Sequence, residues 1–316
     1  MPNRVGALSP LRGPERRPRP RRPAGHGCKP CTRAGEVQEL PAPDGCRRGF
    51  EVVQERPRAC GAGESTVDEV TILIPHFQTL DAIRLCLRAL RRYTPPGVRV
   101  RVLDNGSRDA SRAYLESLTW IELVDTGCAN ETWQSHFECL NAQVERVATP
   151  WFVVMHSDLH VHHAGWLPFL RAKLALGPYA AVGPRHQSIP APGLWMLPAR
   201  LGAFFERTLA GRSPRLRSIC TLFDAGAFRA AGCRFTTGAR HQDIAFAPAR
   251  RLIAAGHKVL TLPACTLSRY MFHTSATTRI ANRTYRKNPA RHLALRAAYC
   301  RRPDVRAILA DEALDA

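Results

Sequence analysis

The amino-acid sequence predicts a single α/β domain with a mainly parallel sheet, preceded by a basic tail. From Glu69 onward, apolar runs of strand length alternate with segments of helical periodicity, which is typical of parallel strands joined by helices. Before that point the chain lacks such periodicity and is rich in Arg and Pro, a disordered composition. We expect residues 1–67 to be a disordered tail or an upstream extension, residues 68–287 to form the domain, and residues 288–316 to add C-terminal helices.

The composition limits the classes of protein. With 316 residues and 45% apolar content, the chain can bury the core of one sizeable domain. Its net charge of +20 suits an anionic partner, which is a nucleic acid, an acidic membrane surface or a phosphate-bearing substrate. No run approaches the roughly 18–20 apolar residues of a membrane-spanning helix, and the N-terminus lacks the apolar core of a signal peptide. We therefore expect a cytoplasmic protein.

The 11 cysteines do not form a disulfide pattern, because their number is odd and their spacing is scattered. We expect most of them to be reduced and buried. Cys28 and Cys31 have the spacing of a zinc-binding pair, but Cys46 and Cys60 lie too far apart to supply the second pair. A solvated tail is therefore favoured over a zinc site.

The first strand and helix follow from their apolar patterns. Val70–Ile74 is a continuous, β-branched run, as expected of a strand buried on both faces, and we expect it to stop at Pro75. From Leu80 to Leu90, apolar residues recur at spacings of three and four, which predicts a helix that ends before Pro95.

The next elements continue this alternation. From Val98 to Val102, valines alternate with arginines, so the second strand should have one wet face. Ile121–Val124 is the third predicted strand, Phe137–Val147 a second helical stripe and Trp151–Met155 the fourth strand. Parallel sheets bind ligands beyond the carboxyl ends of their strands, so those ends are the place to look for a site.

Polar residues follow three of these strands. Asp104, after the second strand, can accept hydrogen bonds from a nucleobase or ribose, and Gly106 lets a ligand approach the backbone. Asp158, after the fourth strand, can hold a divalent cation that bridges nucleotide phosphates. The alternative for both carboxylates is a turn or a helix cap.

Three segments give a more specific signal. Val70–Phe77 is a strand with a Pro-x-Phe ending, and Leu103–Asp109 contains Asp-Asn-Gly-Ser-x-Asp. Phe152–Val161 places an Asp after a buried strand and is followed by Gly-Trp-Leu. In this order the segments resemble the family 2 glycosyltransferases with the GT-A fold, over roughly residues 69–279.

The resemblance implies roles for particular residues. A divalent metal, Mn²⁺ or Mg²⁺, is expected at Asp158 and His273. The residues implied to bind the nucleotide sugar are Pro75, Phe77, Asp104, Asn105, Gly106, Ser107 and His156, with Phe77 and Asp104 flanking the base. For His273, the alternative is a satisfied structural histidine.

The sequence departs from the family pattern at His156, where the usual motif has its first Asp. Histidine can ligate Mn²⁺ or hydrogen-bond a ribose but adds no negative charge, so metal affinity falls or the preferred ion changes. In an unbroken strand, His156, Asp158, His160 and His162 would share one face as zinc ligands. The resemblance instead implies that the strand ends near Ser157, leaving His160 and the histidines after it on a wet loop.

The resemblance also implies a general base. Asp243 stands where the family supplies the carboxylate that deprotonates the acceptor hydroxyl, a contribution of roughly 10² to 10⁴ in rate. The alternative for Asp243 is the N-cap of the helix that follows it. Asp224 is the competing carboxylate, although its surroundings predict a turn and the start of a helix.

The acceptor is the least specified partner. By resemblance its pocket forms between Pro190 and Ser218, where four large apolar residues stack on a sugar or lipid or else belong to the core: Trp195, Met196, Phe204 and Phe205. Basic residues after His273 hold diphosphate or form a solvated face: Arg279, Arg283, Arg286 and Lys287. The helices from Asn288 onward close the domain or lie on anionic lipid.

The resemblance therefore implies an inverting, metal-dependent glycosyltransferase of the hexosyl class in polysaccharide biosynthesis, with a nucleotide-sugar donor and a saccharide or lipid-linked acceptor. Peripheral contact with an anionic membrane is a further expectation. The first alternative is an inactive protein that binds sugar nucleotides, motivated by His156. The second is a nucleic-acid-binding protein, which is disfavoured because the positive charge is spread along the chain and no aromatic-interleaved basic motif occurs.

Overall fold

The computed structural model describes residues 69–127, 133–191, 215–236, 244–273, 277–281 and 289–316. All of them belong to the second of two compact units of the chain, Gly61–Ala316. The first unit, Met1–Cys60, and with it most of the expected tail 1–67, lies outside the described residues.

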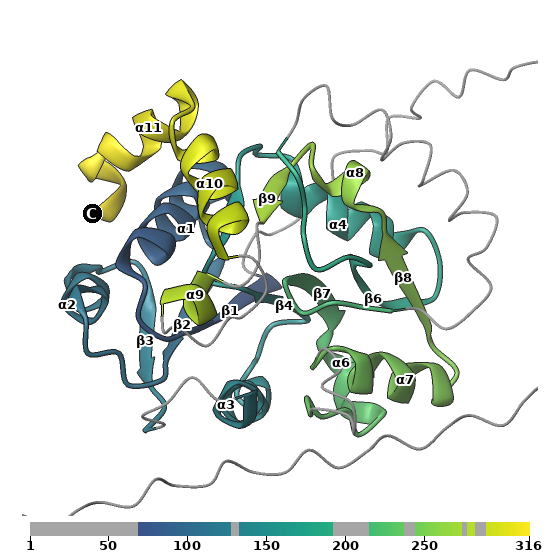
Figure 1. Cartoon of the computed structure of the whole chain (residues 1–316). Helices are drawn as coiled ribbons and strands as arrows, with labels where there is room; N and C mark the ends of the chain where they lie inside the picture. The colour runs from purple at the N-terminus through teal and green to yellow at the C-terminus, as the bar shows by residue number, and fades with distance from the viewer. Residues whose placement is uncertain (1–68, 128–132, 192–214, 237–243, 274–276, 282–288) are drawn as a thin grey trace, which may run out of the picture. The chain divides into compact units, whose positions relative to one another are not determined.

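The centre of the fold is a seven-stranded sheet with the strand order β3-β2-β1-β4-β7-β6-β8 (Figure 1). Its strands are β1 (Val70–His76), β2 (Arg99–Asp104), β3 (Glu122–Asp125), β4 (Trp151–Met155), β6 (Tyr179–Pro184), β7 (Cys220–Asp224) and β8 (Lys258–Leu262). Neighbouring strands are parallel except at β7, which is antiparallel to both β4 and β6. The predicted α/β class with a mainly parallel sheet is confirmed.

A second, two-stranded sheet pairs β5 (Leu159–Val161) with β9 (Met271–His273) in antiparallel register. The helices that surround the strands are α1 (Leu80–Tyr93), α2 (Ala110–Ser117), α3 (Trp133–Val144), α4 (Trp166–Ala175), α6 (Ala225–Ala230), α7 (Phe246–Ala254), α8 (Ala264–Leu267) and α9 (Thr277–Ala281). The C-terminal part forms α10 (Pro289–Cys300), α11 (Pro303–Ala310) and the 3-10 helix η2 (Glu312–Asp315).

Successive residues of the central strands face opposite cores. Ile72 belongs to a cluster with Ile83 and Leu87 of α1, whereas Leu73 packs on the other face with Leu140 of α3. Figure 1 shows α1 and α4 on one side of the sheet and α3, α6 and α7 on the other. Burial on both faces explains why the central strands are continuous apolar runs.

The expectation that β1 stops at Pro75 is wrong. The strand continues to His76, and Pro75 and His76 pair in register with Leu103 and Asp104 of β2. On its other side β1 pairs with β4 only as far as Leu73. Pro75 therefore lies where one neighbouring strand has already ended, so its missing N–H removes no hydrogen bond from that ladder.

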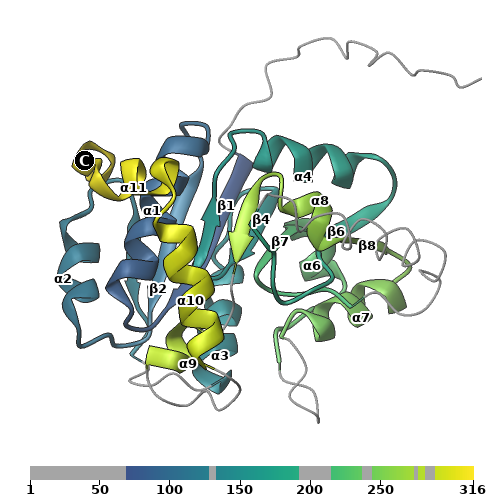
Figure 2. The ribbon, with the colours of Figure 1, turned by 45° about the horizontal axis from the view of Figure 1, so that its top comes forward.

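The C-terminal helices pack against α1, as Figure 2 shows for α11. Tyr299, Val305 and Ile308 form a buried cluster with Leu85 of α1 and Phe272 of β9. Among the described helices, none is long and apolar enough to cross a bilayer. Cysteines of the described segments are free thiols, and burial raises the pKa of those of α1 and β7, Cys86 and Cys220.

Candidate active site

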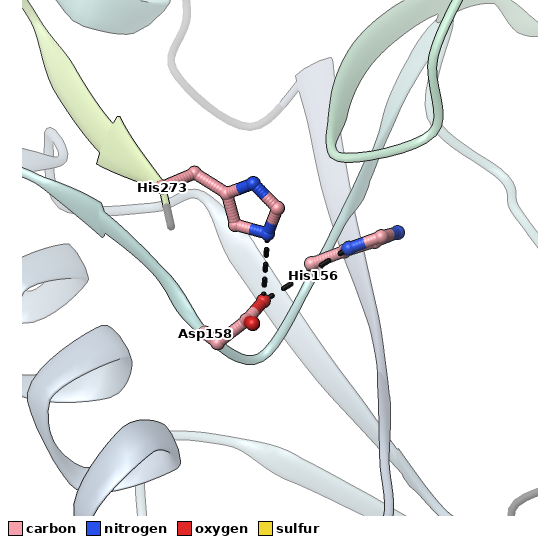
Figure 3. A group of neighbouring side chains, drawn as sticks. All are labelled: His156, Asp158 and His273. Atoms are coloured by element: carbon pink, nitrogen blue, oxygen red, sulfur yellow. Dashed lines mark hydrogen bonds and ion pairs between the residues drawn. The ribbon is translucent and has the colours of Figure 1, made fainter. Parts of the chain in front are cut away.

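Three side chains from two distant parts of the chain meet at the carboxyl ends of the parallel strands of the central sheet (Figure 3). His156 directly follows β4, Asp158 lies in the turn between β4 and β5, and His273 ends β9. The β5–β9 ladder pairs Leu159 with His273, so it places His273 beside the turn that contains Asp158. One potential ligand atom from each of the three side chains lies within 4.8 Å of the others. We call this set the His-Asp-His group.

The distances within the His-Asp-His group are short. His273 Nε2 lies 2.9 Å from Asp158 Oδ1, and His156 Nδ1 lies 3.9 Å from the same oxygen. The other carboxylate oxygen, Oδ2, accepts a hydrogen bond from the backbone N–H of Thr277 at 3.3 Å. The side chain of His273 is fully buried, and that of Asp158 is 10% exposed.

The hydrogen bonds of His273 fix its ring. Nδ1 lies 2.7 Å from the backbone carbonyl of Gln187, and because a carbonyl only accepts, Nδ1 carries the proton of that bond. A neutral His273 therefore presents the lone pair of Nε2 to Asp158. Two acceptors at 2.9 Å require a proton or a cation between them, so the pair is either an ion pair or half of a metal site.

His156 is held by the segment that leads into β7. Its Nε2 lies 3.1 Å from the hydroxyl of Ser218, and its backbone N–H donates to the carbonyl of Ile219. Burial lowers the pKa of His156 to about 4, so the ring is neutral at pH 7. Burial alone would raise the pKa of Asp158, but the charge and hydrogen bond of His273 lower it well below its ordinary value. Asp158 is therefore an ionised carboxylate, and the ring of His156 beside it is neutral.

The two separations measured from Asp158 Oδ1 suit a shared divalent cation. Nitrogen and oxygen ligands bind such ions at about 2.1 Å, so two of them lie about 3.0 Å apart at right angles and about 4.2 Å apart when opposite. The distance of 3.9 Å from His156 Nδ1 to Asp158 Oδ1 lies inside this range, and the distance of 2.9 Å from His273 Nε2 to the same oxygen is about 0.1 Å below its lower limit. The structure brings the two predicted metal ligands, Asp158 and His273, together and adds His156, which was expected on the nucleotide.

The predicted nucleotide-binding turn after β2 is well ordered by its own hydrogen bonds. Asp104 is fully buried and accepts from the backbone N–H of Ser107 at 3.2 Å and from its hydroxyl at 2.5 Å. Arg112 of α2 donates to the same carboxylate at 3.1 Å. Gly106 has a φ of 77°, the left-handed conformation that closes this turn. The turn that the composition suggested is present, and contact between Asp104 and a base remains a prediction.

Other residues that are predicted to bind the nucleotide sugar lie in this turn or at the end of β1. Pro75 is buried in β1, and Phe77, just beyond β1, is half-buried. Asn105 is buried, and its side-chain oxygen accepts a hydrogen bond from the hydroxyl of Thr126 at 2.8 Å. Sequence reasoning missed Arg112, because no spacing rule links it to a carboxylate eight residues earlier on another element.

The expectation that His160 lies on a wet loop is wrong. His160 is in β5, only 2% exposed, and its Nδ1 hydrogen-bonds the hydroxyl of Tyr299 in α10. The alternative of one unbroken strand of zinc ligands is also wrong, because a turn at Ser157 and Asp158 separates β4 from β5. A C-terminal helix covers β5, which local sequence cannot show.

The competing carboxylate Asp224 lies at the far end of the strands from the His-Asp-His group. Because β7 is antiparallel to β4, Asp224 pairs with Trp151, the first residue of β4, whereas His156 follows its last residue. The length of β4 separates these edges by about 13 Å. Asp224 caps α6 instead, accepting from the N–H of Ala227 at 2.7 Å. Asp243 itself lies outside the described residues, and α7 has Ala245 as its N-cap residue.

Several other predictions fall outside the part of the chain that the structure describes. They concern the apolar residues expected at the acceptor, Trp195, Met196, Phe204 and Phe205, and the basic side chains of Arg279, Arg283, Arg286 and Lys287.

A cleft of about 340 Å³ opens beside the first turns of α1 and α2. Its lining includes Thr79 and Asp109, and also Thr277, His292 and Arg296 from the C-terminal part of the chain. Arg296 also lines a small cavity that reaches Asp158, so the cleft and the His-Asp-His group share a wall. Arg296 has no ion pair with any described residue.

The family of the chain follows from its sequence. The sequence model of glycosyl transferase family 2 matches residues 71–235, which is more than half of the chain. The chain belongs to glycosyl transferase family 2, as its three motifs predict. No curated protein matches it in sequence.

Solved glycosyltransferase structures are similar to this chain. Mannosyltransferase PcManGT from Pyrobaculum calidifontis, in complex with GDP-Man and Mn²⁺, has a TM-score of 0.48 at 15% identity, covering 78% of this chain and 84% of its own. Glucosyl-3-phosphoglycerate synthase from Mycobacterium tuberculosis, in complex with Mn²⁺, UDP and phosphoglyceric acid, has a TM-score of 0.46 at 14% identity. The match covers 74% of this chain and 79% of the synthase chain. S. aureus TarS 1-349, in complex with UDP-GlcNAc, has a TM-score of 0.41 at 15% identity. The match covers 62% of this chain and 56% of the TarS chain.

Proposed function

We propose that the chain transfers a hexosyl group from a nucleotide-diphosphate donor to a hydroxyl acceptor, with inversion at the anomeric carbon. One observation supports this most directly: a family 2 chain places the His-Asp-His group at the carboxyl edge of its sheet. The predicted base-binding turn lies at the same edge, because His76 and Asp104 end adjacent parallel strands in register. Donor diphosphate and nucleoside would then occupy one continuous surface.

Each side chain has a distinct role in this proposal. A divalent cation at His156, Asp158 and His273 would neutralise the diphosphate and stabilise the charge that develops on it as it leaves. Asp158 supplies the negative charge, and Gln187 holds the ring of His273 in place. Asp243 accepts the proton of the acceptor hydroxyl on the face opposite the leaving group.

The acceptor is proposed to be a saccharide or a lipid-linked sugar. The cleft beside α1 offers carboxylates and basic groups together with apolar side chains such as Leu80 and Leu293, a mixture that suits a polyhydroxylated ring. Arg296 lines the small cavity that reaches Asp158, and we expect it to bind a phosphate oxygen of the donor, because guanidinium groups pair with phosphate in a bidentate manner.

The test is metal-dependent donor binding and turnover. Full-length chain is titrated calorimetrically with sugar nucleotides, with and without chelator, and the product anomer is identified by NMR. Asp158→Asn should abolish the gain in donor affinity that metal gives, whereas Asp224→Asn, at the opposite edge, should keep it. Equal donor affinity with and without chelator in the unaltered chain contradicts the metal role. Binding without sugar release over days, with any acceptor, would leave a nucleotide-sugar-binding protein.

A further inference from the structure

We propose that the outer face of α10 docks on an anionic lipid surface and brings the mouth of the cleft beside α1 to that surface. The docking is a property of the chain without donor or acceptor, and it is measured in their absence. Only its purpose, which is to present a lipid-linked acceptor to the cleft, rests on the proposed function.

The helix α10 is apolar on two opposite faces. Its inner face carries Tyr299, which is buried with Phe272 of β9 and Leu85 of α1. On its outer face, Leu293 and Leu295 are 53% and 51% exposed. A surface helix normally turns polar residues toward water, and an exposed apolar face with a polar rim marks an interaction site. The remaining exposed apolar residues of the outer face are Ala290, Ala294, Ala297 and Ala298.

These exposed residues form a continuous stripe along the helix. From Ala290 to Ala297 they recur at spacings of three and four, so they lie one above another on one face. Leu295 and Ala298, three residues apart, widen the stripe on one side. Because α10 lies at the surface of the domain (Figures 1 and 2), a flat partner can reach the whole stripe.

Basic residues flank the stripe at both ends. Arg291 lies in the first turn of α10 and Arg301 directly follows its last turn, and both are exposed. The sequence has no Asp or Glu between Asp243 and Asp304, and Asp304 is paired with Arg302 at 2.9 Å. Such a face suits an anionic bilayer, because leucine enters the boundary between head groups and acyl chains while arginine binds lipid phosphate.

The same features disfavour two other occupants of the outer face. In a symmetric contact between two copies, the arginines of one α10 would face those of the other, and like charges would repel. A nucleic acid would bind the arginines through its phosphates, but α10 exposes no aromatic ring on which a base could stack, and the exposed leucines would gain nothing.

The outer face of α10 adjoins the cleft beside α1. His292, Leu293 and Arg296 all line this cleft, and Leu293 is also exposed on the outer face. The buried cluster around Tyr299 holds α10 against α1, so the face and the cleft keep their relative positions. A lipid-linked acceptor whose anchor stays in the bilayer would therefore place its head group at the mouth of the cleft.

The experiment uses the full chain without donor or acceptor. Flotation with vesicles of phosphatidylcholine alone, or of phosphatidylcholine with phosphatidylglycerol, measures the partition coefficient, and amide hydrogen exchange locates the contact. We expect binding to the anionic vesicles to be at least about tenfold tighter than to the neutral ones and to weaken with added salt. Exchange should slow in α10 and remain unchanged in α7.

The double variant Leu293→Gln, Leu295→Gln should lower the partition coefficient on anionic vesicles by about tenfold or more, because its apolar contact with the bilayer is lost. Both side chains are exposed, so the variant should fold. The double variant Leu176→Gln, Ile253→Gln is the matched control. These residues are also large, apolar and exposed, at 69% and 41%, but they lie after α4 and in α7, so vesicle binding should be unchanged.

Three results would overturn the inference. The first is a chain that does not bind anionic vesicles. The second is unchanged binding in the leucine double variant, which would place the contact in another basic part of the chain, such as residues 1–67. The third is self-association that the same variant abolishes, without vesicle binding, which would make the occupant a second copy.

The outcomes separate this inference from the proposed function. Vesicle binding through α10 in a chain with no affinity for any sugar nucleotide upholds the inference and removes the function. Sugar transfer by a chain that does not bind vesicles removes the inference and leaves the function.

Discussion

The hydroxyl of Tyr299 hydrogen-bonds Nδ1 of His160, a residue 139 positions earlier, and so joins α10 to β5. The ring of Tyr299 also stacks on Phe272 of β9, with centroids 3.7 Å apart. Phe272 and His160 are directly paired across the small sheet. Because this sheet brings Asp158 and His273 together, a helix beyond the residues matched by the family model supports the His-Asp-His group from behind.

Tyr299→Phe should reduce stability by about 1–3 kcal/mol. The variant keeps the ring and its stacking but leaves a nitrogen of buried His160 without its partner. Chemical denaturation measures the free energy of unfolding. Tyr179→Phe is the matched control, since the hydroxyl of Tyr179 has no hydrogen bond among the described residues and its loss should cost little. A Tyr299→Phe variant as stable as the unaltered chain contradicts the role of this hydrogen bond.

Asp315→Asn should destabilise the fold by about 3 kcal/mol or more. Asp315 is bonded to Arg88, which is only 4% exposed in α1, and to the hydroxyl of Tyr114 at 2.8 Å. Removing the charge leaves a buried guanidinium without its counter-ion. Thermal and denaturant unfolding measure the loss.

Asp311→Asn provides the comparison for Asp315→Asn. Asp311 also pairs with an arginine of α1, Arg92, but at 3.7 Å and with both side chains exposed to solvent. Exposed pairs contribute roughly 0–1 kcal/mol, so this variant should remain close to the unaltered chain. Similar losses in the two variants would show that burial of Arg88 is unimportant.

Stability should fall as the pH drops from about 6.5 toward 4, in part through His76. Burial lowers the pKa of His76 to about 4 in the folded chain, although Asp104 and Asp109 oppose the shift. The unfolded chain binds a proton near pH 6.5, so acid favours unfolding, and the contribution of one such group approaches about 3 kcal/mol at pH 4. When the free energy of unfolding is measured from pH 7.5 to 4, its dependence on pH should be weaker in His76→Gln than in the unaltered chain. His163→Gln, which changes an exposed histidine, should retain it.

The sequence predicted those elements whose pattern is set by burial within one element. Val70–Ile74 and Trp151–Met155 lie inside the sheet, and the stripe from Leu80 to Leu90 faces it, so each pattern is local. The pairing of β5 with β9 depends on residues more than a hundred positions apart, and each strand has three residues. Such short strands carry no periodicity, and their burial comes from distant elements: Leu159 and Met271 join the core cluster of α1, whereas His160 and Phe272 meet Tyr299 of α10.

The same distinction applies to the site. Asp158 and His273 were found because motifs mark them, but the distance between them is set by the β5–β9 register. The hydrogen bonds of Ser107 and Arg112 to Asp104 could not be predicted from the sequence, because they depend on the geometry of the turn and on the position of α2. Asp224 remained a competitor in sequence because nothing local shows that β7 runs antiparallel to its neighbours.

Asp243→Asn should lower kcat by roughly 10² or more and change the donor dissociation constant by less than about threefold. A general base must face the acceptor hydroxyl on the side of the sugar opposite the diphosphate, so it should contact the nucleotide little. Asparagine keeps the size of the side chain but accepts a proton very poorly, so turnover falls while donor binding is spared.

Single-turnover kinetics with a competent acceptor, together with donor calorimetry, separate these two effects for Asp243. Asp224→Asn is the matched control, because Asp224 caps α6 at the far edge of the sheet and its amide can still accept from Ala227. That variant should keep turnover within a few-fold of the unaltered chain. Near-normal turnover in Asp243→Asn would remove Asp243 as the base, and a large loss in both variants would point to a shared structural defect instead of proton transfer.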